Sequence, residues 1–224
     1  MTITLVVMDD GRREYLFQSM TTINRLHGPI VRAVIHDDAG DSGHTQWLRE
    51  TFPEWEVIST PGGRSGFSGA YRNMWTWVRD HDESPYVFTT EQDFRFTRDV
   101  DLAAMATVLA EQTHLTQLAL RRQPWNDTER AAGGVVESRA DEYTDCRDVD
   151  GHQWLEHRLF HTTNPSLMRR DLFTTYRWPT GPHSEGRFSH EVFTDSHRRA
   201  GFWGSRDSGE WVDHIGYTRL GRGY

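Results

Sequence analysis

The sequence predicts an α/β protein with a mostly parallel central sheet and helices on both faces. Three observations predict this class. Apolar runs alternate with amphipathic segments through the first 120 residues, as in a sheet covered by crossover helices. The first run, residues 3–8, has no charged side chain, which is typical of a strand buried on both faces. The length of 224 residues, without a linker or internal repeat, suits a single domain, 1–224.

The first half of the chain follows this alternation closely. Strands are expected over residues 3–8, 31–36, 56–58, 86–90 and 115–120, and helices over 12–26, 45–52, 67–78 and 99–111. The helix over 67–78 has the clearest pattern, because its apolar side chains recur along one helical face. They are Phe67, Ala70, Tyr71, Met74, Trp75 and Val78. A turn is expected before this helix at Pro61-Gly62-Gly63.

The second half has a less regular pattern. Residues 121–151 are polar and predict a long loop around Trp125 that could fold over a substrate. A strand is expected within 153–163 and a short helix within 165–176. A longer helix is expected over 188–200, ending at Gly201, and a last strand over 211–215 precedes an Arg/Gly-rich tail.

Charge and cysteine content exclude several classes of protein. The net charge is −8, from 33 acidic and 25 basic residues, and every basic residue is arginine. A protein that binds nucleic acid without specificity would be basic, so that role is disfavoured. The single cysteine, Cys146, excludes an internal disulfide and a thiolate-rich metal cage. Without an apolar run of about 20 residues or a basic leader, we expect a cytoplasmic protein with no membrane span.

Acidic residues or glycines follow four successive predicted strands. Asp9 and Asp10 follow the first strand, Asp37 and Asp38 the second, Gly62-Gly63-Arg64-Ser65 the third, and Glu91-Gln92-Asp93 the fourth. Open α/β sheets bind their ligands at the carboxyl ends of the strands. The sequence therefore predicts a polar ligand site with a cation at this edge of the sheet.

The Glu91-Gln92-Asp93 motif is the candidate for holding that cation. Its two carboxylates are two residues apart beyond a buried strand, which places them on the same side if the strand continues. Carboxylate oxygens suit magnesium or manganese. The alternative is a turn at the strand end whose acids are simply solvated.

The order of these motifs resembles that of GT-A glycosyltransferases. VIHDDAGDSG is similar to the family's second strand and acidic turn, and PGGRSGFSGAYRN to its glycine-rich loop and helix. SHEVFTDSHRRAGF resembles the acid-and-helix segment that carries the catalytic base of inverting members. WVDHIG resembles the late strand whose histidine completes the metal shell. The resemblance spans roughly residues 3–216 and is nearest to small glycosyltransferases of phages that infect GC-rich actinobacteria, which also fits the absence of lysine.

The resemblance implies a role for each half of the chain. Residues 1–120 would bind the nucleotide sugar, and residues 121–224 would bind the acceptor and carry the catalytic base. Asp93 and His214 would hold manganese or magnesium on the donor diphosphate. The donor pocket would include Asp10, Asp37, Asp38, Arg64 and Glu91. Because the metal motif is Glu-x-Asp rather than Asp-x-Asp, Glu91 would either touch the metal or act through water.

Two acids compete for the role of catalytic base, Glu191 and Glu185. Glu191 is preferred because it opens the predicted helix over 188–200, as the family pattern has it. A helix N-terminus favours the ionised form of a carboxylate, and a general base must be ionised to accept a proton. Glu185 would lie on the preceding loop.

The activity implied is transfer of a sugar from a nucleotide-sugar donor, with a UDP-sugar favoured, to a hydroxyl, with inversion. The acceptor would be a virion protein, a glycan or a hydroxymethylated DNA base, with protein or glycan ahead of DNA. A DNA acceptor would need a phosphate-binding face, for which the candidates are Arg121-Arg122, Arg169-Arg170, Arg219 and Arg222. One alternative is a sugar-phosphate nucleotidyltransferase, which would have a glycine-rich loop after the first strand; the segment MDDGRREY of this chain matches such a loop poorly. The other alternative is a non-catalytic sugar- or nucleotide-binding module.

Overall fold

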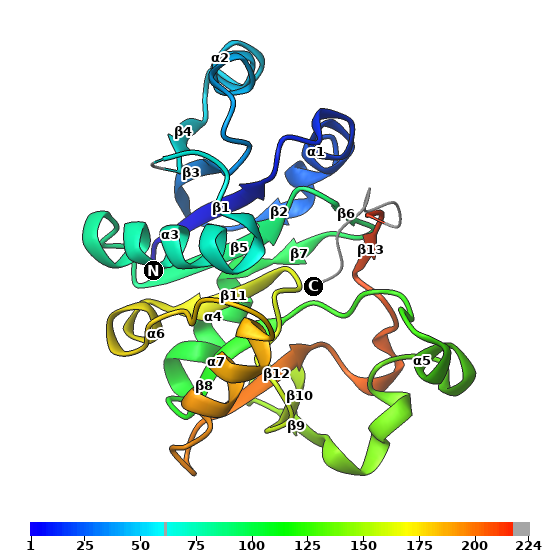
Figure 1. The fold of residues 1–224 in the computed structure, drawn as a ribbon. Helices are drawn as coiled ribbons and strands as arrows, with labels where there is room; N and C mark the ends of the chain where they lie inside the picture. Colours follow the sequence, from blue (N-terminus) through cyan, green and yellow to red (C-terminus); the bar gives the residue numbers. More distant parts are fainter. Residues whose placement is uncertain (61, 217–224) are drawn as a thin grey trace.

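The computed structural model describes residues 1–60 and 62–216, and a nine-stranded sheet forms its centre (Figure 1). The strand order is β4-β3-β1-β5-β11-β8-β12-β10-β9. The bounds are β1 Ile3–Asp9, β3 Ile30–Asp37, β4 Glu56–Ser59, β5 Tyr86–Glu91, β8 Leu115–Ala119, β9 Thr144–Arg147, β10 Gln153–His157, β11 Ser166–Arg169 and β12 Arg199–Trp203. Among these described strands only β10 and β11 run against the others, so the mostly parallel sheet is confirmed.

Helices cover both faces of this sheet. On one face, α1 (Arg13–Met20), α2 (Ser42–Thr51) and α4 (Leu102–Glu111) pack on Leu5, Val7 and Phe88. On the other, α3 (Gly66–His81), α6 (Arg170–Thr175) and α7 (Ser184–Val192) pack on Val6, Met8 and Val87. Successive side chains of a strand point to opposite faces, so a strand buried on both sides is mostly apolar, and its polar side chains need partners. Residues 3–8 of β1 accordingly carry no charge, and the buried Thr4 hydroxyl donates to Asp82 at 2.7 Å.

Two small sheets lie beside the central one. β6 (Phe94–Phe96) pairs with β13 (Val212–His214), and β2 (Leu26–His27) pairs with β7 (Val100–Asp101). The β6–β13 pair joins the last described strand to the segment directly after β5. No helix in the described part of the chain is long and apolar enough to cross a membrane.

Two predicted helices of the first half are longer than the observed ones. The helix expected over 12–26 ends at Met20, where the Thr21 and Thr22 hydroxyls donate to carbonyls of the last turn. The chain then continues through a 3-10 turn, Ile23–Arg25, into β2. The helix expected over 99–111 begins only at Leu102, because the Asp101 side chain accepts a hydrogen bond from Ala104 N at 2.9 Å and caps it.

The prediction of one long loop over 121–151 is wrong. This segment holds α5 (Asp127–Ala132), a 3-10 helix (Glu137–Glu142) and strand β9. Asn126 caps the start of α5, and Gly133, with φ 98°, ends it in the left-handed conformation. The strand expected within 153–163 ends at His157, and the segment 165–176 begins as strand β11 before it becomes α6.

The prediction of a helix over 188–200 is also wrong. Helix α7 covers Ser184–Val192, and the chain re-enters the sheet as β12. β12 lies between β8 and β10, and its Ala200 and Phe202 are buried. Gly201 fits there because a Cβ would lie 3.1 Å from Leu118 Cδ2 and 3.3 Å from the Leu155 carbonyl oxygen. Pairing with two strands therefore overrides the helical pattern of this segment.

The Asp101 cap gives a test of the fold that is remote from the ligand-binding edge. We expect Asp101→Ala to lower the free energy of unfolding by about 1 kcal/mol, because the first turn of α4 loses its side-chain acceptor. Asp101→Asn should restore most of it, because asparagine caps as well as aspartate. Urea denaturation of the three proteins measures the difference. Equal loss in both variants would show that the charge of Asp101, rather than its cap, is what matters.

Candidate active site

The acidic motifs meet at the carboxyl ends of β1, β3 and β5. Asp9 pairs with Asp37 across the β1–β3 register, and Met8 pairs with Glu91 across β1 and β5. The motifs predicted to meet there are thus brought together, because parallel strands end at one edge of the sheet. The residues that follow these ends, Asp10 and Asp93, are joined by side-chain contacts through Arg12.

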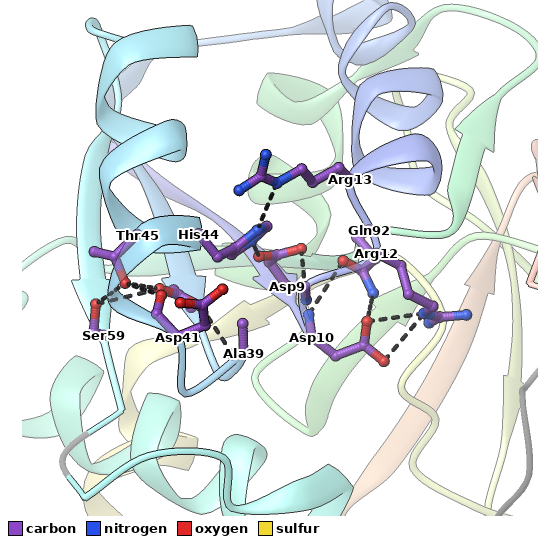
Figure 2. Close-up of polar contacts among 12 residues, drawn as sticks. Asp9, Asp10, Arg12, Arg13, Ala39, Asp41, His44, Thr45, Ser59 and Gln92 are labelled. Atoms are coloured by element: carbon purple, nitrogen blue, oxygen red, sulfur yellow. Dashed lines mark hydrogen bonds and ion pairs between the residues drawn. The ribbon is translucent and has the colours of Figure 1, made fainter.

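Asp10 is the centre of a polar network that links the ends of β1 and β5 (Figure 2). The Gln92 side-chain amide donates to Asp10 Oδ1, and the backbone N–H of Asp10 donates to Gln92 Oε1 at 3.1 Å. Arg12 Nε lies 2.8 Å from Asp10 Oδ1. Arg64 Nη2 lies 3.6 Å from Asp10 Oδ2, with an exposed side chain. Asp10 therefore has two arginines within ion-pair distance.

Asp93 and His214, the predicted metal ligands, lie side by side. His214 Nε2 is 3.4 Å from Asp93 Oδ2, and Arg12 Nη2 is 2.9 Å from the same oxygen. Asp93 is fully buried, and its Oδ1 has no hydrogen-bond partner among the described residues. Burial alone would raise the pKa of Asp93, but His214 and Arg12 outweigh it and bring that pKa below its ordinary value. The carboxylate is therefore held ionised.

Residues 123 and 125, in the segment after β8, position His214. Gln123 Nε2 donates to the His214 carbonyl at 2.8 Å, and His214 N donates to Gln123 Oε1 at 2.8 Å. The imidazole stacks on Phe94, with ring centroids 4.7 Å apart, and contacts Trp125 at 4.4 Å. Sequence reasoning missed Gln123, because the contact spans 91 positions and a lone glutamine in a polar segment gives no signal.

A cavity of about 680 Å³ opens beside His214. Its walls are the N-terminus of α3, the end of β5, residues 162–164 and residues 181–186. Its charged and aromatic lining includes Glu91, Arg122, Trp125, His183, Glu185 and His214. Two carboxylates, one guanidinium and an indole around a half-polar cavity suit a ligand that carries both hydroxyl groups and charge.

Glu91 and Glu185 reach this cavity from different elements. The Tyr71 hydroxyl, on α3, donates to Glu91 Oε1 at 3.1 Å. The backbone N–H of Thr163 donates to Glu185 Oε1 at 2.8 Å, in the first turn of α7. Burial raises the pKa of Glu185 above its ordinary value, against the lowering effect of the Thr163 hydrogen bonds. A carboxyl group with a raised pKa is better matched to proton transfer near neutral pH.

The structure does not place Glu191 as its predicted role requires. Glu191 lies in the last turn of α7, is exposed, and does not line the cavity. The premise that it opens a helix is wrong, because the helix already begins at Ser184. Glu185 occupies the first-turn position that was expected of Glu191. The preference between the two acids therefore reverses.

Asp37 and Asp38, predicted to bind the donor, are buried and bonded within the chain. Asp38 accepts from the Ser65 backbone N–H at 3.1 Å and from the Gly66 N–H at 2.9 Å, and so holds the start of α3. Asp37 accepts from Thr45 Oγ1 at 2.5 Å. Both carboxylates thus shape the loops at the edge of the sheet. Pro61, in the predicted turn between β4 and α3, lies outside the described residues.

A second group of residues could hold a cation. Asp9, Asp37 and His44 are buried and bring one ligand atom each within 4.8 Å of one another. In the structure, His44 Nε2 already lies 2.5 Å from Asp9 Oδ2 (Figure 2). That hydrogen bond is the main reason why the pKa of His44 is raised. In the structure Asp9 and His44 are thus paired with each other, and Asp37 accepts from Thr45.

Known structures place this geometry in context. No protein-family model and no curated protein matches the chain. The structure of S. aureus TarS residues 1–349 with UDP-GlcNAc matches 98% of this chain and 62% of that chain, at 14% identity and a TM-score of 0.64. The mannosyltransferase PcManGT from Pyrobaculum calidifontis, with GDP-Man and Mn²⁺, matches 97% and 58%, at 14% identity and a TM-score of 0.64. The chain has the fold of these proteins.

The α/β architecture that the chain shares with these structures agrees with the one predicted from the sequence. Another structure of S. aureus TarS 1–349 matches as well, at 15% identity and a TM-score of 0.63 over 96% of this chain. The chain spans about 60% of the length of that TarS chain. In this fold the parallel strands β4, β3, β1 and β5 carry the acidic edge, and the cavity lies between that edge and α7.

Gln123 gives a test of how His214 is positioned. We expect Gln123→Ala to destabilise the protein by about 1–3 kcal/mol, because two hydrogen bonds to the His214 backbone are lost. Urea denaturation measures this loss. The exposed Gln46, which donates to Glu50 at 2.7 Å, is the control, and Gln46→Ala should change stability by less than about 0.5 kcal/mol. Equal stabilities of the two variants would contradict the view that Gln123 holds the His214 backbone in place.

Proposed function

We propose that the protein is a metal-dependent glycosyltransferase that moves a sugar from a nucleotide-sugar donor to a hydroxyl acceptor. One observation carries the proposal: Glu185 and His214 line the same cavity at the carboxyl edge of the sheet, and His214 lies 3.4 Å from the buried Asp93. Structures with this fold contain UDP-GlcNAc or GDP-Man. A UDP-sugar is the favoured donor, following the resemblance of the sequence motifs.

The residues at the edge of the sheet fit a divalent cation. Asp93 Oδ1 is buried and unpartnered among the described residues, and the His214 imidazole lies beside the same carboxylate. One carboxylate and one imidazole leave coordination positions for diphosphate oxygens and water, as manganese or magnesium requires. Asp93 and His214 would hold the cation, which supplies positive charge against the leaving diphosphate when it is bound.

Glu185 is the proposed general base. An acceptor hydroxyl in the cavity gives its proton to the Glu185 carboxylate as its oxygen attacks the anomeric carbon. The bond from that carbon to the diphosphate oxygen breaks in the same step, so the configuration inverts. The hydrogen bond from Thr163 N–H orients the carboxylate, and Tyr71 holds Glu91, which also lines the cavity, to meet donor hydroxyls. Arg12 and Arg64, which converge on Asp10, would accompany the diphosphate.

The acceptor is proposed to be a macromolecule, with protein or glycan ahead of DNA. The arginine pairs considered for a phosphate-binding face are engaged within the chain. Arg121 binds the Ser205 and Arg206 carbonyls, Arg122 binds Glu129, Arg169 binds Asp171, and Arg170 binds the Asp82 carbonyl. Arg219 and Arg222 lie outside the described residues. The resemblance to phage enzymes suggests that the acceptor is met in the cytoplasm of an infected host.

Donor turnover is the direct test of this function. The protein is incubated with UDP- and GDP-sugars and MnCl₂, and release of nucleoside diphosphate is measured with and without a chelator. Slow release that the chelator abolishes is the expected result. Consumption of pyrophosphate would identify a nucleotidyltransferase, and binding without turnover would identify a binding module. Transfer of a labelled sugar into a host lysate, followed by separate protease and nuclease digestion, then sorts protein acceptors from DNA.

A further inference from the structure

The Arg12 guanidinium is the cation that Asp93 contacts most closely among the described residues. Its Nη2 lies 2.9 Å from Asp93 Oδ2, against 3.4 Å for His214 Nε2. The Arg12 side chain is 25% exposed, and the Asp93 side chain is 0% exposed. An ionised carboxylate without solvent needs a positive partner, and Arg12 provides one. The contact joins residues 81 positions apart, across the ends of β1 and β5.

The contact between Arg12 and Asp93 disfavours binding of a divalent cation to the same carboxylate. A guanidinium and a metal ion that share Asp93 would repel each other at close range in a poorly solvated site. Arg12 also has other partners, because its Nε binds Asp10 and its guanidinium lies over the Tyr15 ring, 4.9 Å from the centroid. Its Nη1 is buried without a partner among the described residues. Arg12 can therefore give up Asp93 and still hold Asp10, with one donor ready for an anion.

We propose that Arg12 is a resident counter-ion of Asp93 that makes metal binding depend on the donor. Without donor, the metal must compete with the guanidinium and binds weakly. With donor, the diphosphate supplies ligands to the metal and accepts hydrogen bonds from Arg12. The metal ion and the guanidinium are then both attracted to the diphosphate, which offsets their mutual repulsion. The proposal rests on the proposed function for the identity of the anion, and assigns to Arg12 a positioning role that the sequence motifs did not suggest.

The test measures Mn²⁺ binding to the free protein, without nucleotide, by the electron paramagnetic resonance signal of unbound Mn²⁺. Arg12→Gln should bind Mn²⁺ about tenfold more tightly than the wild type, which corresponds to removal of an opposing term of about 1.4 kcal/mol. Arg32→Gln is the matched control. Like Arg12, Arg32 pairs through its Nε with a carboxylate, Glu56 at 2.7 Å, and lies over an aromatic ring, that of Trp77, but it stands near the start of β3, at the other end from the acidic edge. The affinity of Arg32→Gln for Mn²⁺ should equal that of the wild type.

A second readout uses UDP. Adding UDP should increase the Mn²⁺ affinity of the wild type by a larger factor than that of Arg12→Gln, because the variant has no competition to relieve. Arg12→Lys, which keeps a charge but lacks the two-sided guanidinium, should lie between them. When Asp93→Asn is added to both the wild type and Arg12→Gln, the difference between the two should disappear. Circular dichroism confirms that each variant is folded.

Unchanged or weaker Mn²⁺ binding by Arg12→Gln would overturn the proposal and make Arg12 a support for the metal ligands. A tenfold gain that survives Asp93→Asn would also overturn it, because the competition would then lie elsewhere. These readouts use no turnover. If Arg12→Gln gains affinity but no nucleotide sugar is consumed by the wild type, the proposed function fails and the competition between Arg12 and the metal stands.

Discussion

Glu185→Gln is expected to lower sugar transfer by about 10²–10⁴-fold while donor binding stays close to that of the wild type. The amide keeps the shape of the side chain and its hydrogen bond from Thr163 N–H, but it cannot accept the proton of the acceptor hydroxyl. Steady-state rates of nucleoside diphosphate release with acceptor, together with calorimetric titration of UDP, separate the two effects. Loss of rate and of donor affinity in equal proportion would assign Glu185 to donor binding instead.

Glu191→Gln is the matched control for that result, because the two glutamates lie on the same helix. Glu191 is exposed in the last turn of α7, away from the cavity lining, and its substitution should leave the rate within about twofold. A large loss in Glu191→Gln with none in Glu185→Gln would restore the preference drawn from the sequence motif.

The raised pKa of Glu185 adds a pH signature. A general base works only when it is deprotonated, so kcat/KM must fall as the pH drops through the pKa of the base. Since burial raises the pKa of Glu185 above 4.5, the acid limb of the profile should lie above that value. An acid limb at or below 4.5 would contradict Glu185 as the base.

Asp93→Asn is expected to lower turnover by at least about a hundredfold and to remove the effect of Mn²⁺ on UDP binding. A metal's stabilisation of a leaving diphosphate is worth several kcal/mol, and the amide is a poor ligand for a hard cation. A chelator should reduce the wild type to the level of the variant and have no further effect on the variant itself. Equal activity of the wild type with and without chelator would exclude this role.

Asp213→Asn is the control for Asp93→Asn. Asp213 is the neighbour of His214 on β13, points to the opposite face of that strand, and forms an ion pair with Arg95 at 2.9 Å. Its loss should cost no more than a surface ion pair, up to about 1 kcal/mol of stability, and should leave the dependence on Mn²⁺ unchanged.

The parallel half of the sheet could be predicted because its signals are local. β1 and β5 carry no charge before the acid that ends each strand, and the face of α3 buried in the core is the one that helical periodicity selects. The second half could not be predicted in this way. Residues 199–203 form a strand because β8 and β10 flank them on both sides, and no window of sequence around Gly201 contains that fact.

In the candidate site too, only the residues with local signals in the sequence could be predicted. The acids at the strand ends could be named, since each directly follows a recognisable strand. Their partners could not be named: Arg12 meets Asp93 across 81 positions, and Gln123 meets His214 across 91. The choice between Glu185 and Glu191 depended on where one helix begins, and helix ends are where sequence patterns are least informative.

The reversed direction of β11 brings a segment from the second half of the chain to the cavity of the proposed reaction. Because β11 runs against β5 and β8, its first residue, Ser166, lies opposite Thr89 and Ala119, near the ends of those strands at the ligand edge. The preceding residues 162–164 therefore line the cavity next to Glu185, although they belong to no strand that carries the acidic motifs. Insertions or substitutions in this short connection would reshape the wall near the base and leave β1, β3 and β5 untouched. In the proposed reaction, such changes would alter the choice of acceptor and leave the donor-binding strands as they are.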